Sequence, residues 1–289
     1  MYTTLISVSQ LQALQNQGAP LMVFDCSGDL MNPAAADTLF AQTHISGAQR
    51  AQLDQHLSAH DAAQAVNGGR HPLPQRERVA AWLGGLGFDN SMQAVVYDRN
   101  GANYCGRLWW MLKWLGHDAV AVLDGGLQAW QAAGGAVTSL AESASHAPLP
   151  ATTFQLHAPL RALVHTDAVV QQLGRDTQTL IDARAAARYR GEVEPLDPIA
   201  GHIPGALNRP FTQNLNAEGF FKTPAQLKQE FDELLAGRDP GSVVHHCGSG
   251  VSAVPNVLAM EIAGLGPTAL YAGSWSEWSN TPGLPCAKG

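Results

Sequence analysis

Short runs of apolar residues alternate along this chain with longer segments in which apolar residues recur at helical spacing. Strands are predicted at 21–25, 94–97 and 120–123, and again at 179–182, 242–246 and 268–271. Helices are predicted at 8–17, 76–86, 103–115 and 127–133, and again at 167–173, 224–235, 251–263 and 275–278. Strands that alternate with helices are typical of a parallel sheet with helices on its faces. We therefore predict an α/β fold.

The same landmarks occur twice, in the same order. The segment His-Ile-x-Gly-Ala starts at His44 and again at His202, and each copy follows a predicted strand that ends in aspartate. From Val95 and Val243 onward, the two halves align without a gap. A period of about 150 residues indicates duplicated domains rather than a solenoid. We predict two tandem α/β domains, 1–140 and 158–289, joined by a Ser-, Ala- and Pro-rich linker at 139–157.

A cysteine stands at the end of the strand predicted at 242–246. The sequence Cys247-Gly248-Ser249-Gly250 then leads into a predicted helix. Converging backbone N–H groups and the positive end of a helix dipole favour the thiolate, which is the nucleophilic form of cysteine. The alternative is a buried packing cysteine beside a structural turn. Because Arg99 aligns with Cys247, we predict a reactive site in the second half only.

Composition narrows the range of partners. The chain of 289 residues is 45% hydrophobic and 14% charged, with a net charge of −7 and no run of Lys or Arg, so nucleic acid and anionic membranes are poor candidates. Neither a signal peptide nor a transmembrane segment is expected. The four cysteines lie far apart, which argues against a disulfide scaffold and a zinc ribbon. We expect a cytoplasmic protein.

Other candidate chemistry is weaker. His245, His246 and Cys247 are adjacent, but neighbouring strand residues point to opposite faces and would not converge on one ion. No metal and no cofactor are expected. Cys26 and Cys105 are interpreted as packing residues. Cys286 is interpreted as an ordinary tail residue, with a regulatory disulfide as the alternative if it is exposed.

Taken together, the duplicated α/β pattern, both His-Ile-x-Gly-Ala segments, the Cys247-Gly-Ser-Gly-Val loop and the motif at 273–278 resemble the tandem rhodanese-fold sulfurtransferases over almost the whole chain. The uncharged loop is similar to that of the 3-mercaptopyruvate sulfurtransferases. The resemblance implies that Cys247 attacks the sulfur of 3-mercaptopyruvate, which leaves pyruvate and a cysteine persulfide. A thiol or cyanide would then accept the outer sulfur, and thioredoxin is a further candidate acceptor.

The resemblance also implies a proton relay of Ser249, His71 and Asp54, in a cleft between the two domains. Judged singly, His71 could be a surface loop residue and Asp54 a solvated acid or a cap. Arg188 corresponds to the family's substrate-binding arginine, which would clamp a carboxylate. The loop residues expected to contact the substrate are Gly248, Gly250, Val251 and Ser252.

One position departs from the family pattern. Leu196 stands where a second substrate-binding arginine is usual. Loss of a charged hydrogen bond to a carboxylate costs about 1.5–3 kcal/mol, or roughly tenfold to a hundredfold in affinity. Arg190 or Arg209 could compensate for it. Arg184 is instead expected to pair with a neighbouring acid, which is Asp182, Glu192 or Glu194.

Three other functions remain open. A thiosulfate sulfurtransferase would perform the same chemistry on a different donor. A phosphatase of the related type needs an arginine six residues after the cysteine, where this chain has Ala253. A non-catalytic binding or sulfur-carrier module is the third, since the first half carries Arg99 in place of the cysteine.

Overall fold

The computed structural model describes residues 1–143 and 149–289. The chain forms two compact units, and each contains a five-stranded sheet. The first unit comprises Met1–Ser58, Pro74–Leu160 and Glu218–Phe220, and the second comprises Ala59–Leu73, Arg161–Ala217 and Phe221–Gly289. The second unit thus includes a short segment, Ala59–Leu73, from the N-terminal half of the sequence.

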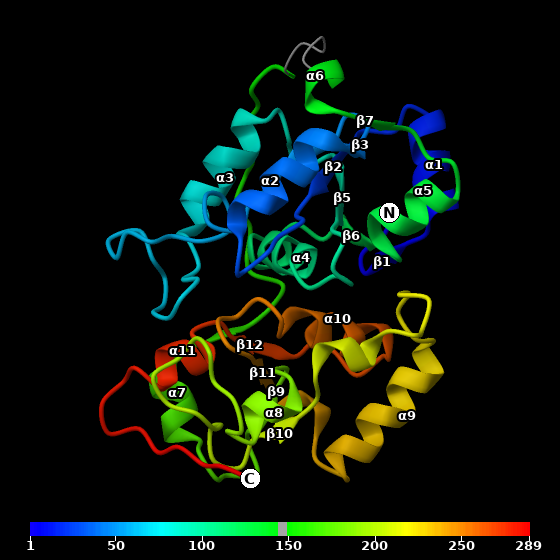
Figure 1. Ribbon diagram of the computed structural model, residues 1–289. Helices are drawn as coiled ribbons and strands as arrows, with labels where there is room; N and C mark the ends of the chain where they lie inside the picture. Colours follow the sequence, from blue (N-terminus) through cyan, green and yellow to red (C-terminus); the bar gives the residue numbers. More distant parts are fainter. Residues whose placement is uncertain (144–148) are drawn as a thin grey trace. The chain divides into compact units, whose positions relative to one another are not determined.

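The sheet of the first unit is parallel throughout. Its strands, in spatial order, are β1 (Leu5–Ile6), β6 (Val120–Leu123), β5 (Gln93–Tyr97), β2 (Leu21–Asp25) and β4 (Gln49–Arg50). A separate antiparallel pair consists of β3 (His44–Ile45) and β7 (Val137–Thr138). The helices are α1 (Val8–Asn16), α2 (Pro33–Gln42), α3 (Arg76–Gly85), α4 (Cys105–Trp114), α5 (Gly126–Ala132) and α6 (Leu140–Ser143). In Figure 1, β2 and β5 lie between α2 and α3 on one side and α1 and α5 on the other.

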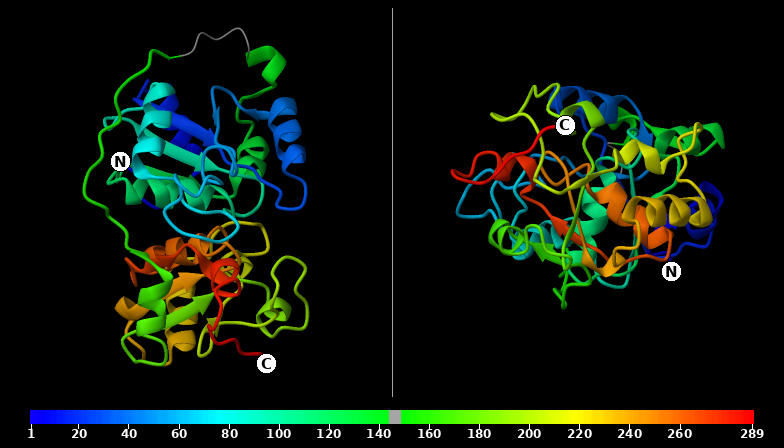
Figure 2. Two further views of the ribbon diagram at one scale, coloured as in Figure 1. Left: turned by 90° about the vertical axis from the view of Figure 1, so that its left-hand side faces the viewer. Right: turned by 90° about the horizontal axis from the view of Figure 1, so that it is seen from below.

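The second unit repeats this plan. Its parallel strands, in spatial order, are β8 (Leu163–Val164), β12 (Ala269–Tyr271), β11 (Val243–His246), β9 (Thr179–Asp182) and β10 (Leu207–Asn208). The α-helices are α7 (Thr166–Gln171), α8 (Ala186–Tyr189), α9 (Pro224–Leu235), α10 (Val254–Ile262) and α11 (Ser274–Trp278). Two 3₁₀ turns, η1 (Phe211–Asn214) and η2 (Pro240–Ser242), complete it. Figure 2 shows the strands of this sheet side by side, with helices around them.

Both sheets have the same strand order. Strands β1, β6, β5, β2 and β4 correspond in place to β8, β12, β11, β9 and β10. The sequence prediction of two α/β domains with mainly parallel sheets is confirmed. Equal topology also supports the gapless alignment of the two halves, because it pairs β5 with β11 and the loops that follow them.

The cores explain why the central strands read as continuous apolar runs. All five residues of β5 and all four of β11 are buried, as expected for parallel strands covered on both faces. Around them pack large side chains, including Trp130 in the first unit and Trp275 and Trp278 in the second. Helix α4 is buried on every side, which explains its run of tryptophans.

Capping residues fix the N-termini of two helices. Ser7 before α1 and Thr223 before α9 each form a capping box with a glutamine three residues later. Helix α10 begins at Val254 and not at 251, as the sequence analysis expected. The reason is local, because Gly250 has a φ of +72° and the next three residues form a turn.

The linker prediction, 139–157, is only partly correct. Residues 144–148 lie outside the described residues. Before them stands a helical turn, α6, and after them the chain packs on the first unit. Phe154 is buried there and stacks on Phe88, and the Thr152 N–H donates to the Gly84 carbonyl over 2.8 Å. An aromatic residue inside a Ser/Ala/Pro-rich stretch is the signal that this part is anchored.

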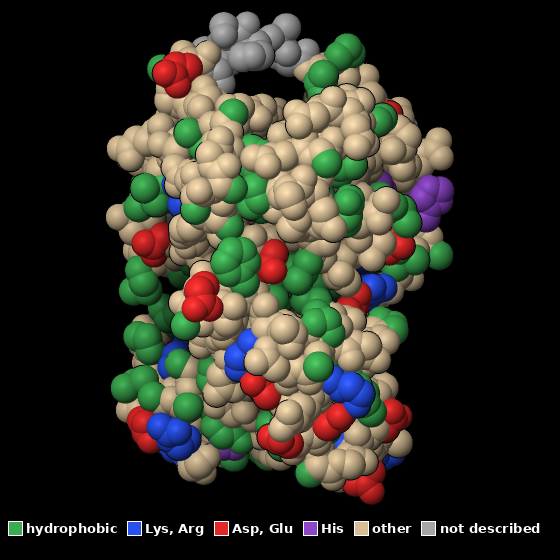
Figure 3. All heavy atoms as spheres, turned by 90° about the vertical axis from the view of Figure 1, so that its right-hand side faces the viewer, with side chains coloured by type: hydrophobic (Ala, Val, Ile, Leu, Met, Phe, Trp, Pro, Cys, Tyr) green, Lys and Arg blue, Asp and Glu red, His purple; other side chains and the backbone are tan. Residues whose placement is uncertain are grey.

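The surface carries charges of both signs. On the face in Figure 3, Lys and Arg side chains are interspersed with Asp and Glu. Among the described residues, none of the helices is long and apolar enough to cross a membrane.

Candidate active site

Cys247 lies at the carboxyl end of the central strand of the second sheet. It directly follows β11, which pairs with β9 on one side and β12 on the other. The loop is held by the first turn of α11. The Trp275 N–H donates to the Cys247 carbonyl over 2.9 Å, and the Ser276 N–H donates to the Gly248 carbonyl over 2.8 Å. Cys247 itself is only 2% exposed, so its side chain sits in a protected position.

Ser274 anchors this arrangement from a strained conformation. Its φ is +56°, in the left-handed region that non-glycine residues rarely adopt. Its hydroxyl accepts a hydrogen bond from the Cys247 N–H at 3.1 Å and donates to the Tyr271 carbonyl at 2.9 Å. Ser274 was not among the residues predicted from the sequence. Its left-handed backbone could have been inferred from the alignment of the two halves, because Ser274 aligns with Gly126, which has a φ of +59° in the first unit.

The Cys247 loop leaves backbone donors available to an anion. Within the described parts of the chain, no protein acceptor is hydrogen-bonded to the N–H groups of Gly248, Ser249, Val251 or Ser252. Gly250 lets the loop pass close to its neighbours, since a Cβ there would lie 2.3 Å from the Ala272 carbonyl oxygen. Unpaired N–H groups of such a loop can donate hydrogen bonds to an anionic group that is bound there.

His71 and Ser249 are in direct contact. The His71 Nδ1 and the Ser249 Oγ lie 2.7 Å apart, and both side chains are buried. The two residues were expected to pair across two domains, whereas the structure groups both of them in the second unit. The reason is the segment Ala59–Leu73, which belongs to that unit and carries His71 with it.

Asp54, the third predicted member of the relay, belongs to the first unit. It lies in the turn that follows β4, and it is half-buried. Its role in orienting His71 stays a prediction.

Arg188 lies beside the Cys247 loop. A Cβ built on Gly248 would be 3.5 Å from Arg188 Nη1. The same guanidinium donates to Glu194 Oε1 at 2.6 Å and to Asp197 Oδ2 at 3.1 Å. Its position therefore suits the role that the resemblance implies.

The other arginines named in the sequence analysis are engaged elsewhere. Arg184 pairs with Asp182 at 2.7 Å, as expected. Arg190 is exposed and bonds to Glu192. Arg209 is buried and bonds to Asn214 and Glu230. Arg190 and Arg209 both have other partners, so neither of them compensates for the arginine that is absent at position 196.

A further arginine, which the sequence analysis missed, lies next to the loop. Arg70 Nη2 would be 3.3 Å from a Cβ built on Gly248. Its backbone N–H donates to Ser276 Oγ at 3.0 Å, which ties it to the segment that holds Cys247. Its neighbour His71 was the available signal, because a residue adjacent to a predicted site member must lie near the site.

The two histidines of β11 are structural groups. Burial lowers the pKa of His245 to about 3, and burial also lowers the pKa of His246. Burial alone would raise the pKa of Asp182, but His246 and Arg184 hold it below its usual value. In the ranges 1–143 and 149–289, no group of three or more His, Cys, Asp or Glu side chains could hold a metal ion.

The remaining cysteines differ from Cys247 in their surroundings. Cys26 and Cys105 are fully buried, and desolvation together with nearby Asp98 raises both pKa values. Neutral thiols of this kind are poor nucleophiles. Cys286 is an exposed free thiol near the end of the chain.

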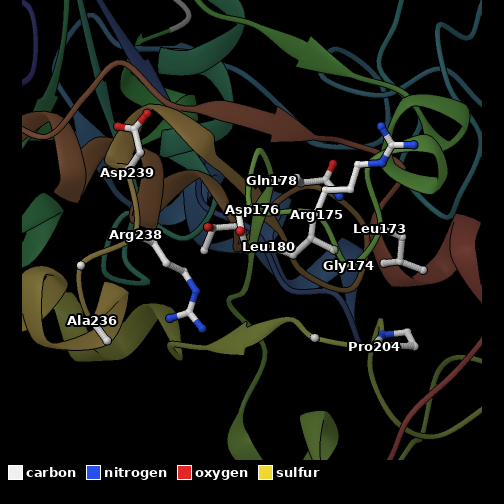
Figure 4. A pocket seen from close by; sticks show the side chains of 13 residues that line it. Leu173, Gly174, Arg175, Asp176, Gln178, Leu180, Pro204, Ala236, Arg238 and Asp239 are labelled. Atoms are coloured by element: carbon white, nitrogen blue, oxygen red, sulfur yellow. The ribbon is translucent and has the colours of Figure 1, made fainter.

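A cavity of about 560 Å³ lies elsewhere in the second unit (Figure 4). It is lined by Arg175, Asp176, Arg238 and Asp239, and by Thr179, the first residue of β9. Cys247 follows the last residue of β11, and the two strands are parallel. The cavity is therefore at the opposite end of the sheet. Figure 4 shows that the guanidinium groups of Arg175 and Arg238 do not converge.

Comparisons with known proteins agree with this arrangement. Residues 7–133 and 165–281 each match the Rhodanese-like domain. A Pseudomonas aeruginosa protein named "Probable 3-mercaptopyruvate sulfurtransferase" is 42% identical over 286 residues, covering 99% of this chain and 98% of that protein. The Arabidopsis thaliana "Thiosulfate/3-mercaptopyruvate sulfurtransferase 1, mitochondrial" is 37% identical over 74% of this chain and 61% of its own length.

A solved structure, the 3-mercaptopyruvate sulfurtransferase from Leishmania major, superposes with a TM-score of 0.81 at 29% identity. The match covers 98% of this chain and 76% of that one. The fold and the loop thus define a two-domain sulfurtransferase. The chain belongs to the family of rhodanese-like domains, of which it contains two copies, and the resemblance noted in the sequence is confirmed.

Proposed function

We propose that this protein takes sulfane sulfur from 3-mercaptopyruvate onto Cys247 and passes it to a thiol or to cyanide. The observation that carries the proposal is the hydrogen bond of 2.7 Å between His71 and Ser249, since Ser249 lies in the same uncharged loop as Cys247. A donor whose leaving group must be protonated needs such a pair, since a proton can pass along it.

The first step separates sulfur from carbon. The Cys247 thiolate attacks the sulfur of 3-mercaptopyruvate and forms an S–S bond, while the C–S bond breaks and its electron pair stays with the pyruvate enolate. The enolate carbon then takes a proton, for which the Ser249 hydroxyl and the His71 imidazole provide a route. Pyruvate leaves, and Cys247 carries a persulfide. In this proposal Asp54 orients His71.

The loop stabilises the negative charge on sulfur in both states. The N–H groups of Gly248, Ser249, Val251 and Ser252 have no protein acceptor among the described residues and can donate to a thiolate or a persulfide anion. Arg188 would bind the carboxylate of the donor. Gly250 contributes by allowing the close turn of the loop.

The second step moves the outer sulfur to an acceptor. A thiolate or cyanide attacks that sulfur, and the S–S bond breaks to return the Cys247 thiolate. We include thioredoxin among the candidate acceptors. We place the reaction in the cytoplasm, because all four cysteines are free thiols, as a reducing compartment keeps them. Residues 1–140 are the proposed domain without the catalytic cysteine, and residues 158–289 are the proposed catalytic domain.

Thiosulfate is the second candidate donor. Two guanidinium groups, from Arg70 and Arg188, lie next to Gly248 and could hold an anionic donor other than a 2-oxo acid. The relative from Arabidopsis thaliana, moreover, carries both donors in its name.

The donors are distinguished by kinetics with cyanide as acceptor. We expect kcat/KM for 3-mercaptopyruvate to exceed that for thiosulfate by at least about tenfold. A Ser249→Ala variant should lose activity mainly with 3-mercaptopyruvate, since thiosulfate releases sulfite and needs no proton on carbon. A preference for thiosulfate of about tenfold or more would contradict the proposal.

A further inference from the structure

We propose that His56 is a positioning residue for the reaction with 3-mercaptopyruvate, because its imidazole closes the turn that carries Asp54. This inference rests on the proposed function, in which Asp54 orients His71, and adds to it the group that orients Asp54. The turn follows β4, which is parallel to β2, so it lies at the carboxyl end of the first sheet. His56 and Asp54 both belong to the first unit.

Two hydrogen bonds between Gln52 and His56 close the turn on itself. The His56 N–H donates to the Gln52 carbonyl at 2.9 Å, and the Gln52 N–H donates to His56 Nδ1 at 3.0 Å. Asp54 stands midway between these two residues in the sequence. The backbone that carries its carboxylate is therefore fixed from both ends, and a side chain provides one of the two acceptors.

Two helices hold the same turn from outside. From α3, Arg78 Nη2 donates to the Gln55 carbonyl at 2.9 Å. From α4, Arg107 donates to the Leu57 carbonyl through Nε at 3.1 Å and through Nη2 at 3.0 Å. These anchors fix where the turn lies, whereas the contact between the imidazole and the backbone fixes how the turn is folded around Asp54.

The imidazole of His56 is itself held in one orientation and one protonation state. Its ring stacks on Trp82 of α3, with the ring centroids 4.9 Å apart and an interplanar angle of 12°. Because Nδ1 accepts a hydrogen bond from the Gln52 N–H, it carries no proton. The imidazole is therefore the neutral tautomer with its proton on Nε2.

The charges around the ring keep it neutral. Burial lowers the pKa of His56, and the nearby guanidinium groups of Arg50 and Arg78 lower it further. The Asp37 carboxylate acts in the opposite direction, but it is itself bonded to Arg50 at 2.9 and 3.1 Å. At neutral pH the acceptor on Nδ1 thus remains in place.

Loss of this acceptor should affect the two sulfur donors differently. With 3-mercaptopyruvate a carbon must take a proton, and the proposed relay of Ser249, His71 and Asp54 supports that step. Thiosulfate releases sulfite and needs no proton on carbon. A displaced Asp54 carboxylate should therefore slow the reaction with 3-mercaptopyruvate and leave the reaction with thiosulfate almost unchanged.

The test compares steady-state kinetics of His56→Leu and His56→Asn, with cyanide as acceptor. Leucine removes the acceptor, whereas asparagine keeps one, because its Oδ1 is bonded to Cγ as Nδ1 of histidine is. For His56→Leu we expect kcat with 3-mercaptopyruvate to fall about tenfold, with KM and the activity on thiosulfate within about threefold of wild type. His56→Asn should retain at least about half of the wild-type kcat with 3-mercaptopyruvate.

His117→Leu is the matched control for a loss of stability in the first unit. His117 is buried, its ring contacts Phe88, and its Nε2 donates to the Ala119 carbonyl at 3.1 Å. It precedes β6 and so lies at the opposite end of the parallel sheet from Asp54. Urea unfolding measures the stability of each variant, and His117→Leu should lose stability while its kinetics with both donors stay those of wild type.

The inference is overturned by a His56→Leu enzyme with unchanged kcat for 3-mercaptopyruvate, or by one that loses activity with both donors equally. An equal loss in His56→Asn, or the same donor-selective loss in His117→Leu, also overturns it. Should His56→Leu fail to fold, His56→Gln takes its place, because its amide oxygen lies one bond farther from the backbone. A wild-type enzyme that does not turn over 3-mercaptopyruvate shows that the proposed function has failed, and this result is distinct because it involves no variant.

Discussion

The loops that follow β5 and β11 occupy equivalent places in two sheets of equal topology, yet their backbone donors meet different partners. In the first unit the Asp98 carboxylate accepts hydrogen bonds from four backbone N–H groups, three in the loop and one at the start of α4, at 2.8 to 3.0 Å. In the second unit His246 stands at the aligned position, and the Gly248, Ser249, Val251 and Ser252 N–H groups have no acceptor among the described residues.

This difference shows two ways in which a duplicated loop can lose the ability to bind and react: loss of its thiol and occupation of its backbone donors. The first loop not only has Arg99 in place of the cysteine; an anion from its own chain also occupies its donors. The second loop keeps both the thiol and the open donors. The same backbone geometry, with φ of +64° at Ala102 and +72° at Gly250, thus serves a structural purpose in the first unit and, in our proposal, a chemical purpose in the second.

Removal of the nucleophile should have the largest effect of the substitutions proposed here, because it abolishes the chemical difference between the two loops. Cys247→Ser makes the second loop as inert as the first, and we expect sulfur transfer to fall at least about a thousandfold with either donor. The assay is cyanolysis with 3-mercaptopyruvate and with thiosulfate. Cys286→Ser is the control and should retain wild-type activity, because its thiol is an exposed tail residue. Equal losses in both variants would refute the assignment.

Loss of the loop hydroxyl is the next test. Ser249 aligns with Gly101, which has no hydroxyl, and it contacts His71 at 2.7 Å. We expect Ser249→Ala to lower kcat with 3-mercaptopyruvate about tenfold to a hundredfold, because protonation of the enolate slows. Ser242→Ala is the control, because Ser242 precedes β11, at the other end of the strand from Cys247, and its hydroxyl donates to the Asp239 carbonyl. A Ser249→Ala enzyme with unchanged kcat would remove the proton relay from the account.

Substitution of Asp98 should weaken the hydrogen bonds that hold the first loop. An asparagine there would turn an N–H group toward loop donors, and we expect Asp98→Asn to lower the free energy of unfolding by about 2–4 kcal/mol. Urea unfolding measures this change. Asp29→Asn is the control, since Asp29 is exposed and also accepts from loop N–H groups. No loss of stability in Asp98→Asn would show that the carboxylate does not hold the loop.

Acid should expose a further difference between the aligned positions Tyr97 and His245. A pKa of about 3 in the folded state, against 6.5 for a free histidine, means that the unfolded chain binds the additional proton between these pH values. The contribution of His245 to the free energy of unfolding is therefore fully present above pH 6.5. It falls by about 1.4 kcal/mol per pH unit as the pH drops below that value. Tyr97 stays neutral over that range, because burial raises its pKa.

The measurement is urea unfolding at pH 7.5 and pH 5.0, for wild type and for His245→Leu. We expect the variant to lose less stability on acidification than wild type does, by about 2 kcal/mol. Equal losses would mean that His245 is not the group that titrates.

Much of this architecture was readable from the sequence, and the exceptions have physical reasons. The central strands were predicted to within one residue, because strands buried on both faces must be apolar throughout. The helix α2 was missed, as were the two-residue edge strands, which carry too short a pattern. The packing of 149–157 on the first unit was missed because one buried aromatic, Phe154, decides it.

The site divides in the same way. Cys247, Ser249 and His71 were predicted from motifs, and the contact between the last two is present. Arg70, Asp98 and Ser274 were not predicted, because their importance depends on partners far away in the sequence or on a backbone angle. Asp197 illustrates the point: nothing in its local sequence shows that it bridges two arginines.

Mass spectrometry of the intact protein after incubation with 3-mercaptopyruvate, without an acceptor, tests the central claim most directly. The account predicts that wild type gains one sulfur atom, that peptide mapping places it on Cys247, and that cyanide removes it. Cys247→Ser should gain none. A wild-type protein that gains no sulfur, or one that carries it on Cys26, Cys105 or Cys286, would contradict the account.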